Sequence, residues 1–136
     1  RIAPFLRLNN ELLWLSLQCV AGPLHFDENE NLHAVVRGVK RFELFHPAYG
    51  AELYDGTRMR TRYHLWAWDN ATMRGHLHGV DPLIAPPRYM PFSPVRLSAP
   101  DLARQPAFAR ARRLKCEVRA GEVLYLPSFW WHDVRA

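Results

Sequence analysis

His25 and Asp27 lie two positions apart in the stretch PLHFDENENLHAVVRGVK, residues 23–40. Residues two apart on a strand point to the same side, so this imidazole and this carboxylate can bind one metal ion together. A third ligand must come from elsewhere, and we expect it to be His132, in the late segment FWWHDV. Two histidines and one carboxylate leave three positions of an octahedral ion open for reactants, as in non-haem Fe(II) sites. The plainer alternative is a chance motif, with His25 an ordinary hydrogen-bonded histidine.

Lys40 is one of only two lysines in a chain that contains 16 arginines. Arg37 and Gly38 are suited to close a tight hairpin, because glycine tolerates the positive φ that such a turn needs. Arg41 and Glu43 would then face water. The two-residue strand period would place on the opposite face a set of six residues: Asn31, His33, Val35, Lys40, Phe42 and Leu44.

A lysine on that inner face can pair, as a compact point charge, with a dicarboxylate cofactor, and Asn31 can donate and accept hydrogen bonds beside it. A surface lysine and a structural asparagine are equally ordinary interpretations. His33 shares the face and is either a supporting residue of the site or a hydrogen-bonded core histidine. Trp130 shares a face with His132 and is expected to wall the metal pocket.

The elements that must position these residues are mostly short strands. Strand patterns occur in residues 12–20, 63–69, 116–120, 122–126 and 129–134, with a turn at Ala120–Gly121. Between about residues 55 and 94 the pattern loosens into a long insertion. The segment from Ser98, a candidate N-cap, predicts one or two short helices that Pro106 breaks or kinks. Together these patterns predict a mainly β sandwich or barrel within a single domain, residues 1–136.

The insertion contains a second group of histidines. His76 and His78 form an HLH pair, with His64 upstream. They are a rival metal site, although loop histidines beside glycine are more often exposed to solvent. Trp66 and Trp68 alternate with His64 and are better explained by packing than by stacking on a cofactor.

Composition restricts the class of protein. The 136 residues are 49% hydrophobic and 12% aromatic, which indicates one folded domain rather than a disordered chain. Cys19 and Cys116 lack the spacing of a zinc ribbon or disulfide scaffold, which favours a reducing compartment, the cytoplasm or the nucleus. No apolar run approaches the roughly 20 residues that span a bilayer, so no membrane partner is expected. The net charge of +5 comes from scattered arginines and favours a solvated surface over nucleic-acid binding. The oligomeric state is not predicted.

Two motifs resemble those of JmjC-domain 2-oxoglutarate oxygenases. PLHFDENENLHAVVRGVKRFELFHP has the family's HxD, an Asn six residues after the His, a hairpin Gly and a Lys fifteen after the His. AGEVLYLPSFWWHDV resembles the motif that carries the second His. The segment from Leu97 to Val134 is similar to the JmjC lysyl hydroxylases that modify developmentally regulated GTP-binding proteins. The likeness covers roughly residues 12–54 and 92–134.

The resemblance implies a double-stranded β-helix of the jelly-roll or cupin type. It implies Fe(II) ligation by His25, Asp27 and His132, and pairing of Lys40 with the distal carboxylate of 2-oxoglutarate, with O2 as the oxidant. Asn31 would be a further residue of the cofactor pocket. The implied activity is that of a protein hydroxylase acting on a lysyl side chain of a protein substrate, with a GTP-binding protein as the first candidate.

The sequence also departs from the family pattern. Gly22 stands where relatives commonly have a threonine that hydrogen-bonds the cosubstrate, so that contact is missing or is supplied by another group. The chain ends at Ala136, where relatives continue with further strands, so we expect a partial domain.

Other functions stay open on the sequence alone. A JmjC histone or protein lysine demethylase would use the same site. A cupin-like binding module would keep the metal residues without turnover, and a cupin isomerase would have no need of Lys40.

Overall fold

The computed structural model describes residues 8, 11–16, 22–55, 59–60, 64–69, 71–79 and 89–136. Short strands dominate these residues: β1 (Asn31–Ala34), β2 (Val39–Phe45), β3 (Met59–Arg60), β4 (His64–Asp69), β5 (Arg74–Gly79), β6 (Tyr89–Met90), β7 (Leu114–Arg119), β8 (Val123–Leu126) and β9 (Trp131–Arg135). Two 3-10 helices, η1 (Pro47–Tyr49) and η2 (Pro106–Arg110), are the helical segments of this part of the chain. The predicted mainly β class is confirmed.

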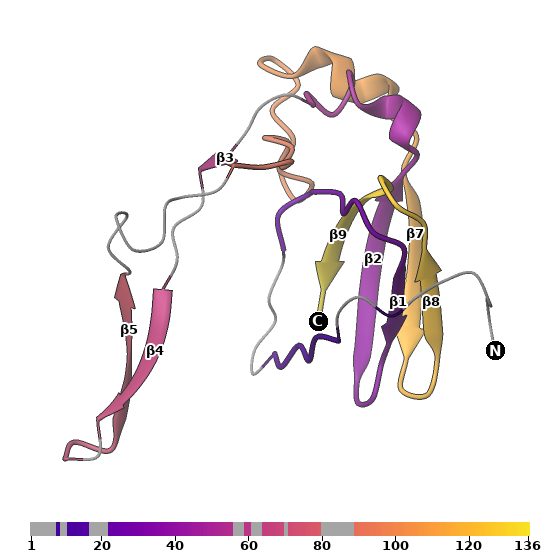
Figure 1. Cartoon of the computed structure of the whole chain (residues 1–136). Coiled ribbons are helices and arrows are strands. Elements are labelled where there is room, and N and C mark those ends of the chain that lie inside the picture. Colours follow the sequence, from indigo (N-terminus) through magenta and orange to yellow (C-terminus); the bar gives the residue numbers. More distant parts are fainter. Residues whose placement is uncertain are drawn as a thin grey trace.

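Two antiparallel sheets form the part of the molecule that carries the candidate site (Figure 1). One has the order β7-β2-β9, with β2 in the centre, and the other is the pair β1-β8. The outer edge of β9 is covered by the chain before β1, because the Gly22 amide donates to the Val134 carbonyl at 3.0 Å. His25 continues this edge through bridges to both His132 and Phe92. Residues far apart in sequence are thereby brought next to β9.

Side chains alternate along the central strand as the two-residue period requires. On β2, Phe42 and Leu44 are buried while Arg41 is exposed. Phe42 lies opposite Cys116 on β7 and Val134 on β9, so the three point into one layer between the sheets. The buried residues of this core are Val35, Phe42, Leu44, Val118 and Leu126.

A second core lies beyond the end of this layer. Trp131 at the start of β9 is 1% exposed, and Phe26 meets it edge-on with ring centroids 4.8 Å apart. The buried members of this core are Leu24, Phe45, Leu53, Val95, Leu97 and Trp131, with Phe108 of η2 packed against them. Trp131 and His132 are adjacent but point to opposite faces of β9, so this core anchors the strand that carries His132.

The predicted hairpin between residues 31–36 and 39–44 is wrong. β1 pairs with β8, and both edges of β2 are already hydrogen-bonded to β7 and β9, which leaves β2 no edge for β1. The chain instead turns a corner between the two sheets at residues 35–38, where Gly38 has φ +84°. This corner runs beside the β7–β8 corner, since the amide of Gly121 donates to the carbonyl of Val35 at 2.8 Å (Figure 1, lower end).

The residues that this hairpin was expected to place on one face nevertheless point into the same interior. Asn31 and His33 of β1 are half-buried while the residues between and after them are exposed. Lys40 is half-buried on the same face of β2 as Phe42. Glu43 was expected to face water, yet its side chain is only 13% exposed and is paired with Arg113 at 2.9 Å.

The helical prediction for the segment after Ser98 is only partly right. Turns occupy its first part, and Asp101 rather than Ser98 accepts the capping bond, from the Arg104 amide at 3.1 Å. Pro106 does not kink a longer helix but begins η2, because proline lacks an amide hydrogen and forces the preceding Gln105 out of helical geometry (φ −129°, ψ 56°).

Two other segments also depart from prediction. Residues 12–16 are exposed and lie in no strand, and the rest of the predicted 12–20 strand lies outside the described residues. The strand predicted at 63–69 is confirmed as β4, which forms an antiparallel hairpin with β5. Within the described part of the chain, no helix has the length and apolar character needed to cross a membrane.

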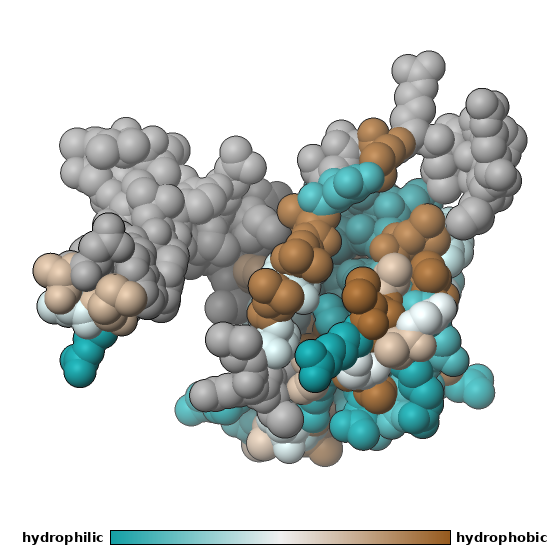
Figure 2. Space-filling view, turned by 90° about the horizontal axis from the view of Figure 1, so that it is seen from below, coloured by the Kyte–Doolittle hydropathy of each residue, from teal (hydrophilic) through white to brown (hydrophobic). Residues whose placement is uncertain are grey.

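The outer face of the β1-β8 pair is apolar. Leu32 and Tyr125 lie opposite each other there and are 53% and 52% exposed, and Val123 is 57% exposed. Figure 2 shows hydrophobic residues reaching the surface of the two-sheet part, between hydrophilic ones. The inward faces of the same two strands are the ones that point toward the candidate site.

Candidate metal centre

A reciprocal pair of backbone hydrogen bonds places His25 opposite His132. The amide of His132 donates to the carbonyl of His25 at 2.7 Å, and the amide of His25 donates to the carbonyl of His132 at 3.1 Å. Directly opposed residues on antiparallel segments point to the same side. The two imidazole rings therefore lie together, with centroids 4.3 Å apart, although 107 positions separate them in the sequence (132 − 25).

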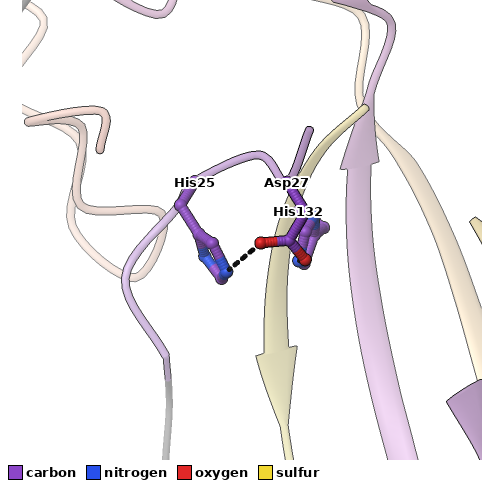
Figure 3. A group of neighbouring side chains, drawn as sticks. All are labelled: His25, Asp27 and His132. Carbon is purple, nitrogen blue, oxygen red and sulfur yellow. Dashed lines mark ion pairs between the residues drawn. The ribbon is translucent and has the colours of Figure 1, made fainter. Parts of the chain in front are cut away.

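Asp27 completes a group of three. Its Oδ1 lies 4.0 Å from Nε2 of His25 and its Oδ2 lies 3.6 Å from Nε2 of His132. One ligand atom from each of the three residues falls within 4.8 Å of the other two. Figure 3 shows the carboxylate standing between the two rings, which point toward it. The structure thus brings together all three residues predicted to bind the metal ion.

Backbone carbonyls fix both histidines in the form that a metal ion requires. Nδ1 of His25 lies 2.7 Å from the carbonyl oxygen of Pro23, and Nδ1 of His132 lies 3.0 Å from that of Trp130. Because a carbonyl only accepts, each Nδ1 must carry the hydrogen. In the neutral rings the lone pair is then on Nε2, the atom that faces Asp27, and such outer contacts are typical of metal-binding histidines.

Burial keeps His132 neutral. Its side chain is 2% exposed, and desolvation together with the nearby His25 lowers the pKa of His132 to about 4. A neutral imidazole is the form that binds a metal ion. The chemistry of this donor set, two imidazole nitrogens and a carboxylate, fits a divalent first-row metal.

Two contacts hold Asp27 in place. The side-chain amide of Asn31 donates to Oδ2 of Asp27 at 2.9 Å, and the backbone amide of Phe129 donates to the Asp27 carbonyl at 2.7 Å. Phe129 has φ 65°, a conformation that a bulky residue rarely adopts and that functional sites often retain. Asn31, predicted as a cofactor residue, therefore also orients a predicted metal ligand.

Lys40 and His33 face the interior next to this group. The pKa of His33 is lowered by burial and by the positive charge of Lys40, so the two side chains interact electrostatically. The His33 ring lies 6.2 Å from the His132 ring. Lys40 forms no ion pair with any residue in the described part of the chain.

Some residues of the site carry no signal in the sequence. Pro23 and Trp130 act through carbonyl oxygens, and Phe129 acts through its amide, so their side-chain types do not predict their roles. Phe92, in the expected insertion, meets the His25 ring edge-on with ring centroids 5.6 Å apart. Trp130 was expected to line the metal pocket. Its side chain instead packs against the core between the sheets and against His46.

The rival histidine pair lies on the β4–β5 hairpin, where Leu65 is paired with His78 and Ala67 with His76. The side chains of His64, His76 and His78 are outside the described part, as are those of Trp66 and Trp68.

Residues 5–136 match the cupin-like domain family, and the chain belongs to that family. The human "Bifunctional peptidase and (3S)-lysyl hydroxylase JMJD7" is 40% identical over 124 residues, which are 90% of this chain and 36% of that protein. "Lysine-specific demethylase JMJ32" of Arabidopsis thaliana is 33% identical, over 90% of this chain and 35% of its own length. Human "tRNA wybutosine-synthesizing protein 5" is 30% identical, over 81% and 25% respectively.

These similarities confirm the resemblance to JmjC-domain proteins, and the β sheets agree with a cupin-like fold. Proteins of the JmjC class typically use Fe(II) and 2-oxoglutarate. The chain spans about a quarter to a third of the length of these relatives.

Proposed function

We propose that this chain provides the iron and cosubstrate site of a 2-oxoglutarate-dependent protein hydroxylase. The observation that carries the proposal is the convergence of His25, Asp27 and His132. In the neutral form of both rings the lone pair lies on Nε2, because each Nδ1 contacts a backbone carbonyl. Three protein ligands of this kind leave positions open for reactants. The similarity to a lysyl hydroxylase and to a lysine-specific demethylase supports the same class of chemistry.

Each residue has a distinct role in this proposal. His25, Asp27 and His132 hold the metal ion, and Asn31 keeps the Asp27 carboxylate turned toward the two rings. Lys40, half-buried and without an ion-pair partner among the described residues, pairs with the distal carboxylate of 2-oxoglutarate. The hydrophobic layer around Phe42 and Leu44 lines this interior.

When bound, Fe(II) and 2-oxoglutarate supply a reaction in which O2 oxidises 2-oxoglutarate to succinate and CO2. One oxygen atom of O2 enters succinate, and the other is inserted into a C–H bond of the substrate. The chain would hold these ligands on β9 and on the segment paired to it. A lysyl side chain is the first substrate to test, and a GTP-binding protein is the first candidate partner.

An anaerobic titration of the full-length protein with Fe(II) and 2-oxoglutarate tests the cofactor site. We expect the visible charge-transfer band of the chelate in the wild type, no band in Asp27→Ala, and a band that needs about tenfold or more 2-oxoglutarate in Lys40→Ala. Asp101→Ala is a suitable control because this carboxylate is exposed and, among the described residues, pairs with Arg104 alone. A wild-type protein that gives no band would refute the proposal.

Mass analysis of the product separates the two lysine reactions. Hydroxylation adds one oxygen atom to the peptide. Demethylation removes a methyl group as formaldehyde, because hydroxylation of an N-methyl carbon gives an unstable product. If the protein binds its partner equally well without iron and in His25→Ala, and forms no succinate, a binding module would be the better description.

A further inference from the structure

His33 is a polar side chain of the interior that the metal centre does not use. It projects inward from β1, and its ring lies edge-on to Phe42 of β2 with centroids 5.3 Å apart. Its Nε2 is buried, and it is the one buried side-chain nitrogen or oxygen without a hydrogen-bond partner among the residues that the structure describes. A buried polar atom left without a partner is costly, so such an atom is often completed by a ligand.

Lys40 faces the same space from the opposite sheet. It lies two residues before Phe42 on the inward face of β2, and its charge acts on His33. No carboxylate of the described residues lies within ion-pair distance of its ammonium group. Two groups able to donate hydrogen bonds thus face the space between the sheets, with the His33 ring 6.2 Å from that of His132. Neither has a protein acceptor among the described residues.

One carboxylate would satisfy both donors. It has two oxygens and about four acceptor positions, so a single group can accept from an ammonium and from an imidazole N–H together. We propose that His33 is a second anchor for 2-oxoglutarate, donating from Nε2 to the distal carboxylate that Lys40 neutralises. This inference rests on the proposed function and adds to it a residue that selects dicarboxylate over monocarboxylate 2-oxo acids.

The competing explanation is that His33 only packs against Phe42. Two substitutions separate the explanations. His33→Phe keeps an aromatic ring of similar size against Phe42 but removes the donor. His33→Gln keeps an N–H donor at a comparable distance from the backbone while removing the ring.

The experiment is calorimetric titration of the full-length protein loaded with Mn(II), which replaces Fe(II) and prevents turnover. The ligands are 2-oxoglutarate and 2-oxobutyrate, which has the chelating 2-oxo acid but lacks the distal carboxylate. We expect His33→Phe to weaken 2-oxoglutarate binding by about tenfold to hundredfold, as for loss of a hydrogen bond to a charged group. His33→Gln should recover most of that affinity. Binding of 2-oxobutyrate and of Mn(II) should change less than about threefold in either variant.

Two results would overturn the inference while leaving the proposed function intact. One is a His33→Phe protein that binds 2-oxoglutarate as tightly as the wild type. The other is an equal loss of affinity for 2-oxoglutarate and 2-oxobutyrate, since a merely structural residue would affect both ligands. A wild-type protein that binds Mn(II) but not 2-oxoglutarate would refute both the inference and the proposed function.

Discussion

Asp27 is the residue on which the candidate centre depends, because its two oxygens face two different histidines. The HxD spacing predicted that His25 and Asp27 lie on one side, and this is confirmed in the structure. The sequence could not predict how the carboxylate is oriented. That orientation comes from Asn31, whose amide donates to the oxygen nearer His132.

Replacement of Asn31 tests this orienting role. We expect Asn31→Ala to weaken Mn(II) binding by about tenfold to hundredfold in the absence of 2-oxoglutarate, as is typical when a residue that orients a metal ligand is lost. Isothermal titration of Mn(II) measures the effect. Asn29→Ala is the matched control, since Asn29 is exposed and contributes only its backbone carbonyl to this region. Equal affinities of Asn31→Ala and wild type would contradict the role.

The buried histidine predicts a pH dependence of stability. The pKa of His132 falls from 6.5 to about 4 on folding, mainly through desolvation, so the unfolded chain binds a proton that the folded chain does not. The free energy of unfolding of the metal-free protein should therefore decrease as the pH falls from about 6.5 toward about 4. Urea unfolding at several pH values measures this. His132→Asn should show a shallower dependence, and an unchanged dependence would exclude His132 as the source.

Elements, rather than single residues, explain which predictions failed. Alternation along 39–45 predicted the inward set of β2 correctly, because that pattern depends only on strand period. It did not predict the partner of β1, since pairing between strands depends on which edges remain free. Gly38 was read as the centre of a hairpin, but a positive φ serves a corner between sheets equally well. Proximity of His25 to His132 likewise depends on long-range pairing. His132 was expected as the third ligand from its place in a late strand segment, and the family resemblance implied the same residue.

The β7–β8 corner depends on a glycine with a positive φ. Gly121 has φ +87°, and a Cβ added there would meet no atom within 4 Å, so substitution costs only backbone strain. We expect Gly121→Ala to lower the free energy of unfolding by about 1 kcal/mol. Gly50→Ala is the control, because Gly50 is helical (φ −51°) and an added Cβ would make ordinary contacts. Chemical denaturation compares the two, and equal effects would contradict the strain argument.

The three candidate metal ligands lie where two parts of the chain that are far apart in sequence come together. His25 and Asp27 precede β1, whereas His132 lies on β9, and the two hydrophobic cores hold β9 from opposite faces. Composition and strand patterning predicted the β class. They could not predict the second core, because Leu24, Leu53 and Val95 come from segments without a regular period.

A metal ion bound by these three residues would link the two parts of the chain. Binding to the folded state alone stabilises it by about 2.7 kcal/mol at a hundredfold excess over Kd. We therefore expect Mn(II) to raise Tm by several degrees in the wild type and a chelator to reverse the rise. Asp27→Ala should show no rise. A similar rise in this variant would mean that Mn(II) stabilises the protein elsewhere.

Succinate formation under isotopically labelled dioxygen shows whether the site oxidises 2-oxoglutarate. The full-length wild-type protein, with Fe(II) and 2-oxoglutarate, should release CO2 and succinate that carries one labelled oxygen atom. Asp27→Ala should release neither above the background of free iron. Unlabelled succinate, or equal amounts from wild type and Asp27→Ala, would contradict the assignment of His25, Asp27 and His132 as the catalytic metal centre.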